Sequence, residues 1–212
     1  MQIRLFDYWR SSASYRARIA LALKGAPYER VPVSLADGEQ LSDAHRARNP
    51  QGFVPALEAD GTVISQSLAI VDWLDGRIPE PRLIPVEPLA RARALQATML
   101  IAADIHPLNN LRVLKHLKND LGLSEDARDD WVRHWVREGF EALERLAAAD
   151  AGRFLGGDAP GIADVFLVPQ MYNARRFALD LAPFPTLVRV DAEAQAHPAF
   201  QDAHPDRVKR TA

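Results

Sequence analysis

Apolar positions in the first 80 residues switch between the period of a strand and the period of a helix. Short apolar runs predict four strands, at Ile3–Tyr8, Tyr28–Val33, Phe53–Glu58 and Thr62–Ser65, the last two joined as a hairpin by Asp60-Gly61. Helical spacing predicts three helices, from the serines near residue 11 to about Leu23, from Asp37 to Arg48 and from Ser67 to Leu74. This βαβαββα order predicts an α/β unit whose helices cover a small mixed sheet.

The second part of the chain follows helical periodicity alone. Residues 77–88 contain four prolines and predict a linker. Three long helices are expected beyond it: Arg91–Leu121 with a kink at Pro107, Ala127–Ala149, and the strongly apolar Ile162–Phe177. The predicted fold is therefore a two-domain α/β plus all-α chain, with a first domain at 1–80, a linker at 81–88 and a helical domain at 89–212.

Composition and charge narrow the classes of function. The 212 residues are 48% hydrophobic, enough for an ordinary core, and the net charge of −2 gives no overall field that would recruit nucleic acid or an anionic membrane. No apolar run reaches the roughly 18 residues that span a bilayer, and the N-terminus lacks the layout of a signal peptide. The absence of cysteine excludes disulfides and thiolate metal sites; we expect no metal and a cytoplasmic location.

Three serines, Ser11, Ser12 and Ser14, join the first predicted strand to the first helix. A strand that enters a helix through small hydroxyl residues presents backbone N–H groups and side-chain donors at the positive end of the helix dipole. Thiol-redox domains of this shape carry cysteines at this turn. Hydroxyls can stabilise a thiolate but cannot supply one, so any sulfur chemistry here requires a bound cofactor.

Two further features of the first domain have both a structural and a functional interpretation. Ser67, preceded by Gln66, is placed as the N-cap of an apolar helix, and a capped N-terminus also suits a carboxylate ligand. Val54-Pro55 begins a predicted strand, where proline forfeits a ladder hydrogen bond. It marks either an edge strand or turn, or a cis peptide bond that exposes the Val54 backbone to a peptide-like ligand.

These features together resemble the zeta class of glutathione transferases. The resemblance covers nearly the full length and is carried by residues 10–21, 49–50, 54–57, 66–70, 106–114, 168–170 and 174–177. It implies a thioredoxin-like, glutathione-binding N-terminal domain, a C-terminal helical bundle that binds the substrate, and a homodimer. Members of the class are typically maleylacetoacetate isomerases of tyrosine catabolism, with bacterial relatives that act on maleylpyruvate.

The resemblance also implies roles for individual residues. Ser11 would donate a hydrogen bond to the glutathione sulfur, assisted by Ser12, and the helix N-terminus would lower the pKa of the thiol. Gln66 and Ser67 would hold the γ-glutamyl end, and Val54 would pair with the cysteinyl backbone. The full cofactor-binding set is Ser11, Gln51, Val54, Gln66, Ser67, His106 and Asn110. For His106 the alternative is a solvated or core histidine beside the kink.

Three arginines, Arg10, Arg112 and Arg176, are the candidates for substrate binding. An arginine is most often a solvated surface charge, but three that converge would suit a substrate with two carboxylates, since guanidinium groups bind carboxylates bidentately. Arg18 is expected to play a structural part on its helix. The implied reaction is reversible addition of the glutathione thiolate to the cis double bond of a maleyl group, rotation about the resulting single bond, and expulsion of the thiolate.

The chain departs from the pattern of the class at two positions. Ala13 stands where the motif often has cysteine, which argues against reactions that need an enzyme thiol but leaves isomerisation intact. Gly161 stands where relatives place a Ser or Thr cap ahead of Asp164, a loss of a few tenths of a kcal/mol. Three alternatives remain: maleylpyruvate isomerisation, conjugation of small α-halo acids, and a non-catalytic binding module with the same fold.

Overall fold

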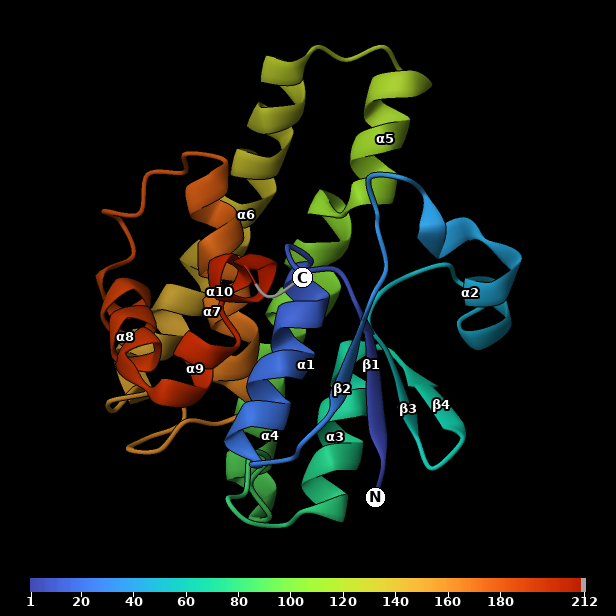
Figure 1. Cartoon of the computed structure of the whole chain (residues 1–212). Helices are drawn as coiled ribbons and strands as arrows, with labels where there is room; N and C mark the ends of the chain where they lie inside the picture. Colours follow the sequence, from blue (N-terminus) through green and yellow to red (C-terminus); the bar gives the residue numbers. More distant parts are fainter. Residues whose placement is uncertain (211–212) are drawn as a thin grey trace. The chain divides into compact units, whose positions relative to one another are not determined.

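The computed structural model describes residues 1–210, which divide into two compact units. One unit combines residues 1–83 with the C-terminal segment from residue 196, and the other comprises residues 84–195. The C-terminal segment, which the sequence-based division assigns to the helical domain, thus packs with the α/β unit. Figure 1 shows its helix α9 (Pro198–Asp202), in red, beside α1 (Ser12–Leu23), in blue. A short helix, α10 (Pro205–Arg210), follows α9.

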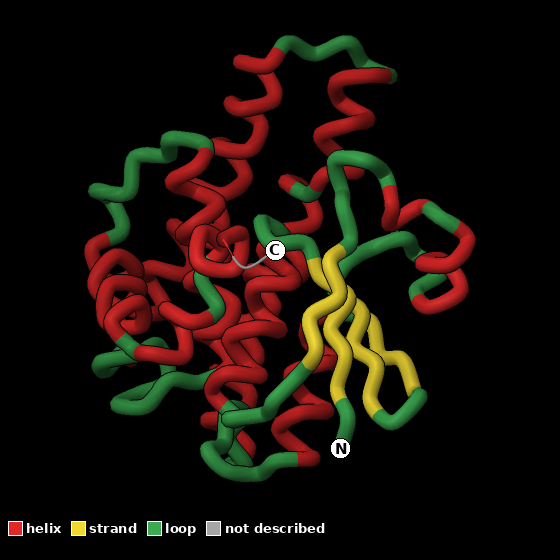
Figure 2. Tube along the Cα trace, viewed as in Figure 1, coloured by secondary structure: helices red, strands yellow, loops and turns green. Residues whose placement is uncertain are grey.

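A four-stranded mixed sheet forms the centre of the first unit (Figure 2). Its strands are β1 (Ile3–Asp7), β2 (Glu29–Pro32), β3 (Ala56–Ala59) and β4 (Thr62–Ser65), in the order β2-β1-β3-β4. β1 is parallel to β2 and antiparallel to β3, and β3 and β4 form the expected hairpin, with positive φ at Asp60 and Gly61. The predicted mixed sheet is confirmed: β4 has the predicted bounds, β1 and β2 are slightly shorter than predicted, and β3 begins three residues later.

Helices pack on both faces of this sheet. α1 packs against α3 (Ser67–Arg77). On the other face, His45 of α2 (Asp43–Arg48) makes an edge contact with the ring of Phe6. The single helix predicted over 37–48 is wrong: a 3₁₀ turn, η1 (Glu39–Leu41), comes first, and Ser42 is extended and caps α2 through its hydroxyl. A residue that serves as an N-cap begins a new helix.

The second unit is helical. Its elements are α4 (Pro88–Met99), a π-helical turn η2 (Leu100–Ile105), a 3₁₀ turn η3 (His106–Asn109), α5 (Leu111–Asn119), α6 (Glu125–Asp150), α7 (Ile162–Arg176) and α8 (Pro185–Ala196). The expected kinked helix over 91–121 is in fact broken into four pieces. Pro107 lacks an N–H, and the side chain of Asn110 caps α5 as a new helix. The predicted helices at 127–149 and 162–177 are confirmed as α6 and α7.

Two packing details matter for the energetics of the second unit. Gly139 of α6 lies so close to Ile105 of η2 that a Cβ at position 139 would overlap the isoleucine side chain. At the start of α7, the Asp164 carboxylate accepts hydrogen bonds from the Gly161 and Leu155 N–H groups, at 2.9 and 2.8 Å. Glycine therefore caps α7 together with Asp164, as expected. Among the described residues, no helix is both long and apolar enough to cross a membrane.

Candidate active site

Three chain segments of the first unit meet at one end of the sheet. Phe6 near the end of β1 pairs with Ala56 at the start of β3, and Ala56 pairs with Ser65 at the end of β4. The turn that leads into α1, the loop that ends at Pro55, and the start of α3 are therefore neighbours. Both α1 and α3 direct their N-termini to this end, where backbone N–H groups and the helix dipoles favour an anion.

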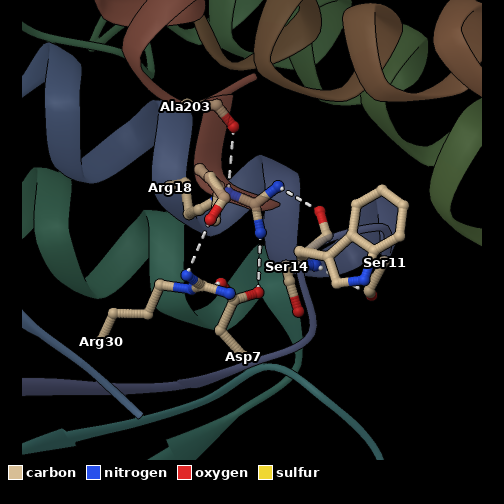
Figure 3. Close-up of polar contacts among 8 residues, drawn as sticks. Asp7, Ser11, Ser14, Arg18, Arg30 and Ala203 are labelled. Carbon is tan, nitrogen blue, oxygen red and sulfur yellow. Dashed lines mark hydrogen bonds and ion pairs between the residues drawn. The ribbon is translucent and has the colours of Figure 1, made fainter. Parts of the chain in front are cut away.

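Ser11 is the N-cap of α1. Its Oγ accepts a hydrogen bond from the Ser14 N–H at 3.2 Å (Figure 3). Its own N–H donates to the Tyr8 carbonyl at 3.0 Å. A hydroxyl has two lone pairs and one proton, so Ser11 can cap the helix and still donate its proton to a thiolate. Ser12 is the first helical residue and is buried. The structural and functional interpretations of Ser11 are therefore compatible.

The start of α3 differs from the expectation in one respect. Gln66, not Ser67, is the N-cap residue, and Ser67 is the first residue of the helix. Gln66 has φ of +70°, a region that L-residues seldom adopt and that costs about 1–3 kcal/mol. Its Nε2 donates to Gln51 Oε1 at 2.7 Å, which joins two of the predicted cofactor residues. Ser67 Oγ accepts a hydrogen bond from Arg16 Nη1 at 3.3 Å.

The loop before β3 contains a cis peptide bond between Val54 and Pro55, which was one of the two interpretations that the sequence left open. The preceding carbonyl, that of Phe53, lies 2.8 Å from His45 Nε2 and accepts a hydrogen bond from Asn49 Nδ2 at 2.9 Å. These two side chains, both buried, hold the loop in place. Sequence reasoning did not identify His45. Asn49 belongs to residues 49–50, one of the segments that carry the family resemblance, and its position before Pro50 was the sequence signal that could have identified it.

Arg16 is a further residue of this region that the sequence did not single out. Its guanidinium is buried at the base of α3, beside Ser67, and burial lowers its pKa to about 9. It therefore still carries its positive charge at neutral pH. The two helix N-termini and this cation give the region a positive potential that suits a peptide-like anion.

Four of the predicted site residues lie in the second unit. His106 is the first residue of η3 and is half-buried; Asn110 accepts hydrogen bonds from the Arg112 and Val113 N–H groups and so caps α5. Arg112 and Arg176 are exposed, and Arg176 Nη1 donates to Asn173 Oδ1 at 3.2 Å.

Arg10, in the first unit, is also exposed, with its guanidinium carbon 5.4 Å from the centre of the Trp9 ring. Within residues 1–210, no three His, Cys, Asp or Glu side chains gather as a metal site would require.

Residues 1–76 match the family described as Glutathione S-transferase, N-terminal domain. The chain is similar to a maleylpyruvate isomerase of Ralstonia sp, with 44% identity over 205 residues that cover 96% of this chain and 97% of the relative. It is also similar to the maleylacetoacetate isomerase of Rhizobium meliloti (strain 1021), with 47% identity over 206 residues that cover 97% of each.

Two solved structures support the same relationship. One is the holo structure of a maleylpyruvate isomerase described as a bacterial glutathione S-transferase of the Zeta class, with a TM-score of 0.95, 44% identity, and coverage of 96% of this chain and 97% of the other. The other is a maleylacetoacetate isomerase of Anaeromyxobacter dehalogenans 2CP-1 with glutathione in its active site, with a TM-score of 0.87, 46% identity, and coverage of 97% and 96%. The predicted fold, a thioredoxin-like sheet followed by a helical part, is confirmed.

Proposed function

Since this chain belongs to the zeta class of glutathione transferases, we propose that it is a glutathione-dependent isomerase that converts maleylacetoacetate to fumarylacetoacetate in aromatic amino-acid catabolism. The observation that carries this proposal is the serine turn. In a chain without cysteine, a hydroxyl caps α1 and retains its proton for an external thiolate, next to a second helix N-terminus.

The residues of the first unit fit glutathione. The Ser11 hydroxyl donates to the sulfur, and the N-terminus of α1 favours its ionised form. Ser67 and the N–H groups at the start of α3, beside the buried charge of Arg16, suit the γ-glutamyl carboxylate. Gln66 and Gln51 orient this end of the cofactor, and the backbone of Val54, next to the cis peptide bond, suits its cysteinyl amide.

When bound, glutathione supplies a thiol whose reversible addition to the cis double bond permits rotation and release of the trans product. The protein lowers the activation free energy of this reaction by holding charged and polar groups in fixed positions. Ser11, assisted by Ser12, stabilises the thiolate before attack and on its release. Arg10, Arg112 and Arg176 bind the substrate carboxylates and orient the chain, and His106 and Asn110 contribute to cofactor binding from the second unit.

Maleylpyruvate is the second candidate substrate, because the Ralstonia relative and the solved structure with a TM-score of 0.95 are named for that activity. The two substrates differ by one methylene, which a pocket discriminates by about 1–3 kcal/mol. Ala13 in place of the cysteine of the class favours either isomerisation over reactions that need an enzyme thiol.

Assembly and location belong to the same proposal. We expect a homodimer, in keeping with the class, and a cytoplasmic location, which the absence of cysteine favours. Size-exclusion chromatography with light scattering tests the first, and a mass of one chain across micromolar concentrations would refute it.

The test of the activity is the decay of maleylacetoacetate and maleylpyruvate absorbance on purified protein, each with and without glutathione. Rapid loss that requires glutathione and yields the fumaryl product supports the proposal, and the ratio of the two kcat/KM values identifies the substrate. Protein that binds glutathione but turns over neither compound would refute isomerisation and favour conjugation or a binding role.

A further inference from the structure

A buried cluster of charged side chains lies behind the serine turn. Arg18 of α1 donates three hydrogen bonds: from Nη1 to Asp7 Oδ1 at 2.7 Å, from Nη2 to the Trp9 carbonyl at 2.9 Å, and from Nε to the Ala203 carbonyl at 3.0 Å (Figure 3). The side chains of Arg18 and Asp7 are both fully buried. One guanidinium thus connects the end of β1, the turn before α1 and the C-terminal segment.

A second arginine, Arg30, binds the same carboxylate. Its Nε donates to Asp7 Oδ2 at 2.7 Å, and its Nη1 donates to the Val208 carbonyl at 3.1 Å. Both arginines therefore pair with Asp7 and both hold the C-terminal segment. The two arginines differ at the turn, because Arg18 donates to the Trp9 carbonyl, whereas Arg30 donates to Asp7 and to the Val208 carbonyl.

The contact at Trp9 reaches the candidate catalytic serine within two residues. Trp9 lies between Tyr8, whose carbonyl accepts the Ser11 N–H, and Arg10. Its indole ring lies 4.8 Å from Lys209 Nζ of the C-terminal segment, a cation–π distance. Arg18 thus holds the backbone that leads into Ser11 at the Trp9 carbonyl, and Lys209 contacts the Trp9 ring.

We propose that Arg18 is a positioning residue for Ser11, and that through it the C-terminal segment 203–209 is part of the scaffold of the cofactor site. The proposal rests on the function proposed above. Arg18 does not touch the reacting atoms. It holds the Trp9 carbonyl and so sets the direction of the Ser11 hydroxyl, which has to meet a thiolate within hydrogen-bond distance.

The test compares Arg18→Lys with Arg30→Lys. Both variants keep a positive charge beside Asp7, but an ammonium group cannot replace the fixed three-way geometry of Arg18. We expect Arg18→Lys to raise the Kd for glutathione about tenfold, equivalent to about 1.4 kcal/mol, and to raise the pKa of the bound thiol measured from thiolate ultraviolet absorbance. Arg30→Lys should leave both quantities at the wild-type value, which controls for loss of a bond to Asp7 and to the C-terminal segment.

Amide hydrogen exchange separates this proposal from the proposed function. In the glutathione-free proteins, exchange across residues 9–15 should be faster in Arg18→Lys than in Arg30→Lys, whether or not the wild type binds glutathione. Equal exchange, or equal Kd and thiol pKa where the wild type binds, would overturn the positioning role. If Arg18→Lys does not fold, the Lys209→Met variant provides the test. Lys209 is exposed, so the variant should fold, and its amide exchange at residues 9–15 should be a few-fold faster than that of the wild type. Unchanged exchange would overturn the proposal.

Discussion

At the scale of single residues, the Ser11 hydroxyl caps α1 and, in the proposed mechanism, also donates to the thiolate, and the Ser11→Ala variant removes both interactions. Loss of the cap should lower the free energy of unfolding by about 1 kcal/mol. Loss of a donor to the thiolate should lower kcat/KM for the isomerisation about 100-fold, by analogy with the loss of one oxyanion donor. Urea unfolding and the absorbance assay measure the two effects separately.

Ser124→Ala is the matched control for the first effect. Ser124 caps α6 with the same geometry, since its Oγ also accepts an N–H, that of Ala127, at 3.2 Å. It should lose a similar amount of stability and keep its activity. If Ser11→Ala matched Ser124→Ala in both measurements, Ser11 would be a helix cap and nothing more.

Residue chemistry that acts locally was predictable from the sequence. The cap at Ser11, the cis bond before Pro55 and the turn at Asp60-Gly61 depend on side chains that act on their own backbone. Ser67 was assigned as a cap because serine prefers that position, but the N-cap is Gln66, which has positive φ, and Ser67 is the first residue of α3. The burial of Arg16 and Arg18 was missed because it depends on partners far along the chain, such as Ser67 and Ala203.

At the scale of helices, substitution of two glycines by alanine should have opposite effects on the free energy of unfolding. Gly76 in α3 has open space around its Cα, so Gly76→Ala should raise the free energy of unfolding by about 0.5–1 kcal/mol through helix propensity. Gly139→Ala in α6 has the same gain in propensity but forces Ile105 aside, and should lower stability by about 1–3 kcal/mol. Urea midpoints measure both. A stabilised Gly139→Ala would show that η2 repacks freely.

The capping box of α7 predicts a dependence of stability on pH. Burial raises the pKa of Asp164 to about 6, against an ordinary value of 3.8, although the N–H groups of Leu155 and Gly161 act in the opposite direction. A carboxyl with a raised folded-state pKa binds its proton more tightly in the folded protein. Its contribution to stability is therefore complete below about pH 4 and is lost as pH rises through 6, by about 3 kcal/mol.

Asp164→Asn isolates this contribution. The amide does not titrate, so the free energy of unfolding of the wild type should fall relative to that of the variant by about 2–3 kcal/mol from pH 4 to pH 7. Denaturant unfolding at intervals of one pH unit measures it. A difference that stays constant across this range would place the Asp164 pKa near its ordinary value.

Element boundaries were predicted well where periodicity determines them and poorly where packing does. Helices α6 and α7 follow their apolar stripes, and both were predicted within a few residues. The π-helical turn η2 has no such signal, because it lies where Ile105 approaches Gly139 of another helix. Only Pro107 marked the region in the sequence.

At the scale of the whole molecule, the C-terminal segment is the feature that sequence division misplaced. Arg18, Arg30 and Tyr15 of the first unit donate hydrogen bonds to its backbone carbonyls, at Ala203, Val208 and Phe200, which any residue can supply and which leave no trace in the sequence. A chain that ends at Asp202 should lose about 3–5 kcal/mol of stability, because Arg18 and Arg30 lose charge-assisted hydrogen bonds. Urea unfolding of the shortened chain measures this loss, and an unchanged midpoint would contradict it.

Because the chain returns to the first unit after residue 195, the two units complete their folds in a fixed order during synthesis. A ribosome releases residues 1–83 early, but the carbonyls that Arg18 and Arg30 require are translated only after the whole helical unit. The helical unit, contiguous in sequence, can complete its fold during elongation, whereas the first unit must wait for its C-terminal segment. The serine turn therefore gains these contacts late in synthesis, and a chain interrupted before Ala203 would carry Ser11 without this support.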